Sequence, residues 1–257
     1  MMPAAAVVSR PGRDAWGQPR LARAWATAED EAPQPIGAAG PSPAAPDPPA
    51  LTQDADMKKP MPEIRSYAGA EITPYLEAIA ALRIAVFRDW PYLYDGDAAY
   101  EAKYLQTYRD SWRSIAVLAF DGPRVVGAST GVPMSDEIPE FRAAFDDHLL
   151  DVDHVFYCGE SVLLPEYRGR GVGHRFFDMR EAHARALGGF NWTTFCAVER
   201  EPDDPRQPPF HRGNEVFWKK RGYTHRPELR ASLPWNEVGR GEREHTLSFW
   251  LRPLGRA

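Results

Sequence analysis

The sequence has little cysteine, no long apolar run and no excess of positive charge. Its 257 residues include two cysteines, Cys158 and Cys196, which form neither a CxxC pair nor a disulfide framework. No segment comes near the roughly 18 uninterrupted apolar residues that a membrane-spanning helix needs. The formal net charge of -5 offers nothing that would attract nucleic acid or an anionic membrane. These absences predict a soluble, cytoplasmic protein that binds neither nucleic acid nor membrane.

Spacings that hold metal ions are also missing. His174 and His183 are nine residues apart, and at about 100° per residue this separation places them on opposite faces of a helix. Cys158 and Cys196 each stand in an apolar segment, which favours small core residues over nucleophiles. The run DDH at 146–148 is typical of a solvated helix end. The sequence therefore predicts no metal site.

The first sixty residues differ in composition from the rest. They hold eleven prolines and many alanines with almost no aliphatic periodicity, so they offer too little apolar surface to offset the entropy of ordering. We interpret residues 1–60 as a disordered Pro/Ala-rich tail. The Arg- and Ala-rich beginning faintly resembles an organellar targeting peptide, and a plain tail or a start further along, near Met57 or Met61, are the alternatives.

From residue 61 to residue 254 the pattern is that of one folded α/β domain. Asp121-Gly122 between two apolar runs is typical of a β-hairpin turn, and Thr73-Pro74 is typical of a helix start. The periodicity predicts strands over 63–68, 114–120, 124–133, 154–164, 191–198 and 245–252. It predicts helices after Pro74 and over 98–110, 136–149, 172–187 and 214–221, the last ended by Gly222.

The run EYRGRGVGHRFF at 166–177 connects a predicted strand to a predicted helix. It fits neither the GxGxxG fingerprint of dinucleotide-binding folds nor the GK[ST] ending of a P-loop. An RGG tract for nucleic acid would be longer and would stand in a basic protein. Glycines let backbone amides approach a ligand, the helix start adds free N–H groups, and Arg168 and Arg170 add charge. The run therefore indicates a diphosphate cradle, the alternative being a turn that uses glycine only for its flexibility.

Two motifs resemble one family. Arg168, Gly171 and Gly173 match the R/Q-x-x-G-x-G/A signature of the GNAT acyltransferases, and SVLLPEYRGRGVG at 161–173 is similar to the strand and loop that bind acetyl-CoA in that family. FWKKRGY at 217–223 is similar to the family's FYxxxGF helix and turn.

The resemblance covers roughly residues 62–253 and implies the GNAT fold: a mixed, mostly antiparallel central sheet that is flanked by helices and splays open between the strands at 154–164 and 191–198. Acetyl-CoA is then the co-substrate. Its pantetheine arm would pair, as an added strand does, with backbone groups of Val162, Leu163 and Leu164. Asn214 would hydrogen-bond the same arm. The diphosphate would rest on the amides of Arg168, Gly169, Arg170, Gly171, Val172, Gly173 and His174.

For the chemistry, we expect an amine to attack the thioester directly, with Glu160 as the base that takes its proton. Glu160 could equally cap a backbone donor or pair with an arginine. The family commonly uses a tyrosine as the acid, but its position here holds Trp218, whose indole cannot act as a general acid. Tyr223 is the alternative acid, although its place in the motif is that of a packing aromatic. Release of the thiolate to solvent by positioning alone is a third interpretation.

The segment DWPYLYDGD at 89–97 carries the residues expected at the acceptor. Trp90, Tyr92, Tyr94 and Asp95 combine ring faces with a carboxylate, a mixture suited to a small cationic amine. The alternative is an aromatic loop that packs over the core with its acids in water. The function expected is thus an acetyl-CoA-dependent N-acetyltransferase for a small molecule. The resemblance also allows a homodimer, since members of the family often dimerise. The alternative function is a non-catalytic acyl-CoA-binding regulatory module, which Trp218 favours.

Overall fold

The structure is a computed structural model that describes residues 61–146, 148 and 150–255. The disordered tail expected over 1–60 lies outside the described residues. The elements follow one another as β1 (Glu63–Tyr67), the 3-10 helix η1 (Gly69–Tyr75), α1 (Leu76–Phe87), α2 (Ala98–Tyr104), α3 (Gln106–Asp110), β2 (Ile115–Asp121), β3 (Arg124–Pro133), η2 (Met134–Asp136), α4 (Pro139–Ala143), η3 (Val152–His154), β4 (Val155–Tyr157), β5 (Ser161–Leu163), η4 (Pro165–Tyr167), α5 (Val172–Leu187), β6 (Trp192–Val198), α6 (Glu215–Lys220), β7 (Thr224–Glu237) and β8 (Gly241–Pro253).

The strands form one open sheet with the order β1-β2-β3-β4-β6-β8-β7, and β5 pairs with β3 beside this path. Every pairing is antiparallel except that of β4 with β6. The mixed, mostly antiparallel α/β architecture expected from the sequence is therefore confirmed. In the part of the chain that the structure describes, no helix is both long and apolar enough to cross a membrane.

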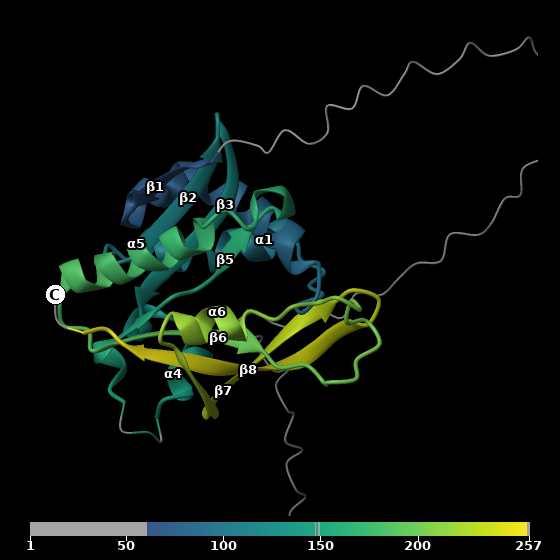
Figure 1. The fold of residues 1–257 in the computed structure, drawn as a ribbon. Coiled ribbons are helices and arrows are strands. Elements are labelled where there is room, and N and C mark those ends of the chain that lie inside the picture. The colour runs from purple at the N-terminus through teal and green to yellow at the C-terminus, as the bar shows by residue number, and fades with distance from the viewer. Residues whose placement is uncertain (1–60, 147, 149, 256–257) are drawn as a thin grey trace, which may run out of the picture. The chain divides into compact units, whose positions relative to one another are not determined.

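Helices cover both faces of the sheet (Figure 1). Helix α5 lies over β2 and β3, because a stripe four residues apart, Val172, Phe176 and Ala184 among them, is buried there. The side chains of Val117 and Ala119 join this cluster. Their neighbours along β2 point to the opposite face, where η1, α1 and α3 pack.

The strand expected over 154–164 is not continuous, which corrects the prediction. Val132 pairs with Tyr157 and Ser129 with Ser161, so β3 advances three residues while the facing chain advances four. This is a β-bulge, with the amide of Gly159 bonded to the carbonyl of Thr130 at 3.1 Å. The bulge divides the chain into β4, which pairs with β6, and β5, which does not.

Three predicted helices also need correction. The first begins as the 3-10 helix η1 with Pro74 inside it, and α1 starts only at Leu76. The helix expected over 98–110 is two short helices that meet at Leu105. Among the described residues of the helix expected over 136–149, the α-helix is α4 at Pro139–Ala143. It begins no earlier because Ile138 is extended and Pro139 is a favourable first residue.

Strand β7 was not predicted at all. Its sequence, THRPELRASLPWNE, contains two prolines, which argue against a central strand. The strand lies at the edge of the sheet, where a missing ladder donor costs little, and a shift in its pairing with β8 occurs between Arg226 and Arg230 and contains Pro227. The last strand is correspondingly longer than the expected 245–252, since β8 spans Gly241–Pro253 and forms a long hairpin with β7 (Figure 1).

Candidate active site

A cavity of about 170 Å³ lies where β5 leaves the pairing of β4 with β6. The last bond that joins the two strands runs from the amide of Cys158 to the carbonyl of Thr194, at 2.7 Å. Beyond it the walls come from the bulge, from β6, from α5, from the start of α6 and from the loop after α1. The cavity is lined by Phe87, Pro91, Tyr92, Gly159, Glu160, Ser161, Phe177, Arg180, Phe195, Cys196, Ala197, Val198, Asn214 and Trp218.

One edge of β5 faces this opening without a partner strand. The carbonyl of Glu160 accepts from the amide of Thr130, and the amide of Leu164 donates to the carbonyl of Val126, so both groups point to β3. Because amides alternate in direction along a strand, Val162 also points to β3, whereas Ser161 and Leu163 present their backbone groups to the open edge. Of the three residues expected to pair with pantetheine, only Leu163 therefore has its backbone groups on the open edge, and those of Val162 and Leu164 point to β3. The Nε of Arg168 donates to the carbonyl of Leu163 at 3.0 Å.

The glycine loop ends directly on α5. Gly169 and Gly171 have φ of +72° and +82°, the left-handed region that glycine adopts without strain, and nothing lies within 4 Å of a Cβ added at either. Gly171 caps α5 without a side-chain bond, and the first turn of the helix holds no acidic residue. The amides of Val172, Gly173 and His174 thus lie at the positive end of a 16-residue helix, as a site for an anion requires.

Glu160 lies at the bulge with its side chain buried. Its Oε2 accepts from Nη1 of Arg83 at 2.5 Å, and Nε of Arg83 bonds to Glu101 as well, so one guanidinium serves two carboxylates. The second oxygen of Glu160, Oε1, is buried and has no hydrogen-bond partner among the described residues. Burial raises the pKa of Glu160, against the opposing effect of Arg83. The carboxylate therefore has one oxygen free to accept a proton beside the cavity.

The two candidates for the acid lie in different places. Trp218 is half-buried and lines the cavity, with its ring 4.9 Å from that of Phe195 and 5.1 Å from that of Trp250. Tyr223 is buried in the core, and its hydroxyl donates to Glu181 at 3.2 Å and contacts the hydroxyl of Thr193 at 3.0 Å. Burial raises the pKa of Tyr223 well above its ordinary value. Tyr223 is not part of the cavity lining.

The four residues expected at the acceptor separate into two groups. Tyr92 lines the cavity, and Trp90 lines a hollow of about 350 Å³ that shares Pro91, Ala197, Val198, Asn214 and Trp218 with it. Arg200 fixes this loop, since its guanidinium donates to the carbonyls of Pro91 and Tyr92 at 2.6 and 2.7 Å. By contrast, Tyr94 is buried against Tyr100, and Asp95 is exposed and paired with Arg88 at 2.6 Å.

Asn214 lies where the cavity and the hollow meet. It precedes α6 as its N-cap without a side-chain bond, so its amide is available to a ligand. The hollow carries further charge from Glu201 and Glu215, both exposed, and a second ring from His211, 6.2 Å from the ring of Trp90.

The two cysteines are not exposed, and the histidines His174 and His183 have separate partners. Cys158 is fully buried, and burial raises the pKa of Cys196 to about 12, so neither thiol is a nucleophile near neutral pH. His183 bonds to the carbonyl of Arg113 at 2.9 Å, whereas the ring of His174 packs on that of Phe217, so they do not converge. Across residues 61–146, 148 and 150–255, no group of side chains could hold a metal ion.

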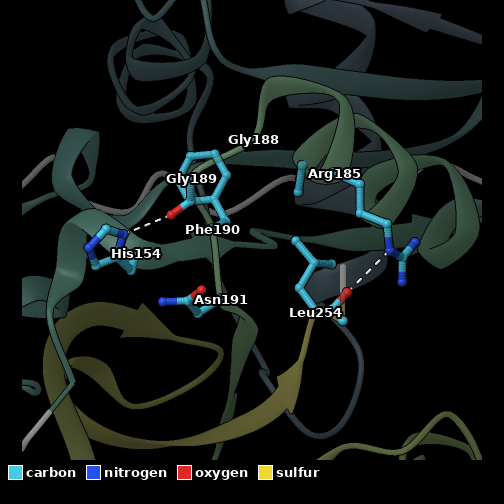
Figure 2. Close-up of a pocket in the computed structure, with 9 residues that line it drawn as sticks. His154, Arg185, Gly188, Gly189, Phe190, Asn191 and Leu254 are labelled. Carbon is cyan, nitrogen blue, oxygen red and sulfur yellow. Dashed lines mark hydrogen bonds between the residues drawn. The ribbon is translucent and has the colours of Figure 1, made fainter. Parts of the chain in front are cut away.

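A second hollow, of about 390 Å³, lies at the other end of α5 (Figure 2). Figure 2 shows His154 turned toward the carbonyl of Gly189, at 2.7 Å, and Arg185 toward that of Leu254, at 3.2 Å. None of the residues predicted for cofactor, catalysis or acceptor lines it. The predicted site thus gathers at the opposite end of the helix.

Two arginines of the site were not anticipated from the sequence. Arg83 is separated from Glu160 by 77 positions, and Arg180 is one of several charged residues along α5. Their one visible signal is their position on the apolar stripe of a helix, where Arg83 follows Ile79 and Leu82, and Arg180 follows Phe176 and Phe177. A charged residue on such a stripe must find partners inside the protein.

Comparisons with known proteins identify the family of the chain. The model of the acetyltransferase (GNAT) family matches residues 79–212, which is half of the chain. Solved structures of similar fold include an N-acetyltransferase from Staphylococcus aureus Mu50, with 12% identity, a TM-score of 0.47 and coverage of 75% of this chain and 99% of that one. Another is an aminoglycoside 6'-N-acetyltransferase complexed with coenzyme A, with 16% identity, a TM-score of 0.48 and coverage of 76% and 98%. No curated protein matches the sequence. The chain belongs to the GNAT family of acetyltransferases, and acetyl-CoA is its co-substrate.

Proposed function

We propose that the protein moves the acetyl group of acetyl-CoA directly to the amino group of a small cationic amine. The observation that carries this proposal is the free oxygen of Glu160, buried at the bulge and beside a cavity that also meets the open edge of β5. An unpaired carboxylate oxygen in such a place is costly unless a ligand uses it.

For the co-substrate, the amides from Arg168 to His174 would hold the diphosphate at the start of α5. The pantetheine arm would then follow the open edge of β5 from Leu163 toward Ser161, as an added strand does. Asn214, opposite this edge, would bond an amide of the arm. This path brings the thioester to the bulge at Glu160.

The chemistry needs the amine as a free base. A lysine-like ammonium titrates near 10.4, so exposing its lone pair near neutral pH costs about 4 to 5 kcal/mol. Glu160 would take that proton on Oε1 and pass it to water before the nitrogen attacks the carbonyl carbon. It would then take the second proton that the nitrogen loses as the amide forms and the C–S bond breaks. Because burial raises the pKa of Glu160, its carboxylate is a stronger base than an exposed one. Arg83 would position it through Oε2.

The acceptor would enter through the hollow beside Trp90. The aromatic rings of this hollow and its two exposed carboxylates, Glu201 and Glu215, suit a cation. Its arginine, Arg200, is paired with Glu237 at 2.5 Å. Of the predicted acceptor residues, Trp90 and Tyr92 would contact the substrate. Tyr94 and Asp95 would instead hold the loop in place.

The test is the release of free thiol from acetyl-CoA with purified protein and a panel of cationic, neutral and acidic amines. The proposal predicts turnover with cationic amines and almost none with Glu160→Gln, which should still bind acetyl-CoA. Turnover confined to acidic acceptors would contradict the acceptor class, and turnover unaffected by Glu160→Gln would contradict the base.

The second candidate is a regulatory module that binds acyl-CoA without transferring the group. Trp218 favours it, because an indole stands at the cavity where the family commonly has its acid. Both functions predict saturable binding of acetyl-CoA. Consumption of acetyl-CoA only in the presence of an amine would decide for the enzyme, and its absence across the panel would decide for the module.

A further inference from the structure

Arg180 is a buried cation with an unused donor at the cavity. It is 1% exposed, and its Nη1 donates to the carbonyls of Thr130 and Glu160, both at 3.2 Å. Its Nε is buried and has no hydrogen-bond partner within the described part of the chain, although the residue lines the cavity. No carboxylate of the described residues forms an ion pair with it. An unpaired guanidinium donor in such a place points to an anion that the protein itself does not supply.

Arg180 lies where the proposed path of acetyl-CoA would bring the reacting sulfur. The residue lies on α5, whose first turn is the cradle for the diphosphate, and its Nη1 bonds to the carbonyl of the bulge residue Glu160. An arm laid along the open edge of β5 ends at this bulge. Trp218 lines the same cavity and cannot give a proton to a leaving thiolate.

We propose that Arg180 is a catalytic residue that binds the coenzyme A thiolate as it leaves, in place of the acid that Trp218 cannot supply. The proposal rests on the proposed acetyl transfer and adds the fate of the leaving group. Glu160 first takes one proton from the ammonium and passes it to water. The nitrogen then bonds to the carbonyl carbon and gives its second proton to Glu160, while the electron pair of the breaking C–S bond goes to sulfur. Arg180 keeps its proton and stabilises the sulfur by charge and by Nε–H. The thiolate then leaves as the coenzyme A product, and Glu160 gives its proton to water.

The other ionisable groups that line the cavity, and Arg83 behind Glu160, do not take this role. Glu160 is an anion, and Arg83 is shared by two carboxylates. Burial raises the pKa of Tyr92 from the loop after α1, and it raises the pKa of Cys196 on β6 to about 12. Both are therefore neutral and weak acids at pH values where a free thiol titrates, near 8.5, so neither offers the sulfur a positive charge. Arg180 is thus the cation available to the sulfur.

The experiment measures the pKa of the thiol of coenzyme A bound to the full chain, from the ultraviolet absorbance of the thiolate against pH, with the free protein subtracted. In the wild type we expect that pKa about 1 to 3 below the value of the free thiol, as an opposite charge at close range produces. Arg180→Gln should return it to the free value or above, with Arg180→Lys between the two. Arg185→Gln, on the same helix but in the hollow of Figure 2, is the matched control and should leave it lowered.

The second measurement is the steady-state rate of acetyl transfer. Arg180→Gln should lower kcat by about 10² to 10³-fold, as the loss of one donor to developing charge does, with little change in the KM of the amine. A wild-type thiol pKa at or above the free value would overturn the inference even if acetyl transfer is intact. So would a rise confined to the KM of the acceptor in Arg180→Gln, because Arg180 would then bind an acceptor anion. Failure of coenzyme A to bind the wild type would instead overturn the proposed function along with it.

Discussion

Replacing Glu160 with glutamine removes the proposed base and leaves its shape. The change takes one negative charge from a buried group of two carboxylates around Arg83, which keeps its bond to Glu101. Breaking a buried pair costs about 3 to 5 kcal/mol when it leaves an uncompensated charge, and here it does not, so we expect a smaller loss of stability. Loss of a general base costs about 10² to 10⁴-fold in kcat. That range equals about 2.7 to 5.4 kcal/mol in the barrier.

The assay is the initial rate of thiol release at saturating amine, together with calorimetric binding of acetyl-CoA to the same preparation. Because the base must be ionised, kcat/KM should rise with pH through the pKa of Glu160, above the range of an ordinary carboxyl group because burial raises it. That limb should disappear in Glu160→Gln. Glu101→Gln is the matched control: it removes the other carboxylate of Arg83, should keep far more of kcat, and should move the limb to lower pH because the charge of Glu101 raises the pKa of Glu160. A Glu160→Gln protein that binds acetyl-CoA and keeps the wild-type kcat and limb would refute the assignment.

Two further predictions concern stability. Burial raises the pKa of Glu137 to about 7, so this acid binds its proton more tightly folded than unfolded, and stability should fall by about 3 kcal/mol as pH rises from about 4.5 to 7. Glu137→Gln, with the Tyr108 hydroxyl able to donate or accept, should flatten that slope in urea titrations at several pH values, and an unchanged slope would show that another group causes it. At Gly159, an added Cβ would lie 2.2 Å from the hydroxyl oxygen of Tyr108 and 2.6 Å from Oγ1 of Thr130, so Gly159→Ala should cost about 1 to 3 kcal/mol in the same titration. Gly173→Ala, where the nearest atom would be 3.8 Å away, is its control, and equal losses in both variants would contradict the steric argument.

The parts of the fold that the sequence predicts are those set by local chemistry. The turn at Asp121-Gly122 joins β2 to β3, and α5 spans Val172–Leu187 as its periodicity indicates. Gly222 follows α6 with a φ of +85°, as expected of the residue after a helix. In each case the deciding contacts lie within a few residues of chain.

The parts that the sequence does not predict depend on distant partners. The prolines of β7 are tolerated because the strand lies at an edge, a position that the local pattern does not encode. The bulge at Gly159 lies where a chain that pairs with β3 on both sides of it ceases to pair with β6. In the site, the place of Glu160 in a predicted strand makes it a candidate. Its partner Arg83 and the neighbouring Arg180 come from two helices that are distant in the sequence. Side chains that meet only after folding leave little trace in spacing.

The central claim is that backbone amides at the start of α5 hold the diphosphate of acetyl-CoA, and titration calorimetry tests it most directly. The wild type should bind acetyl-CoA saturably at one site. Gly171→Val should bind it at least tenfold more weakly, because a β-branched residue at a φ of +82° is strained by about 1 to 2 kcal/mol and changes the course of the loop. Absence of heat with the wild type, or equal affinity in a folded Gly171→Val protein, would contradict the account.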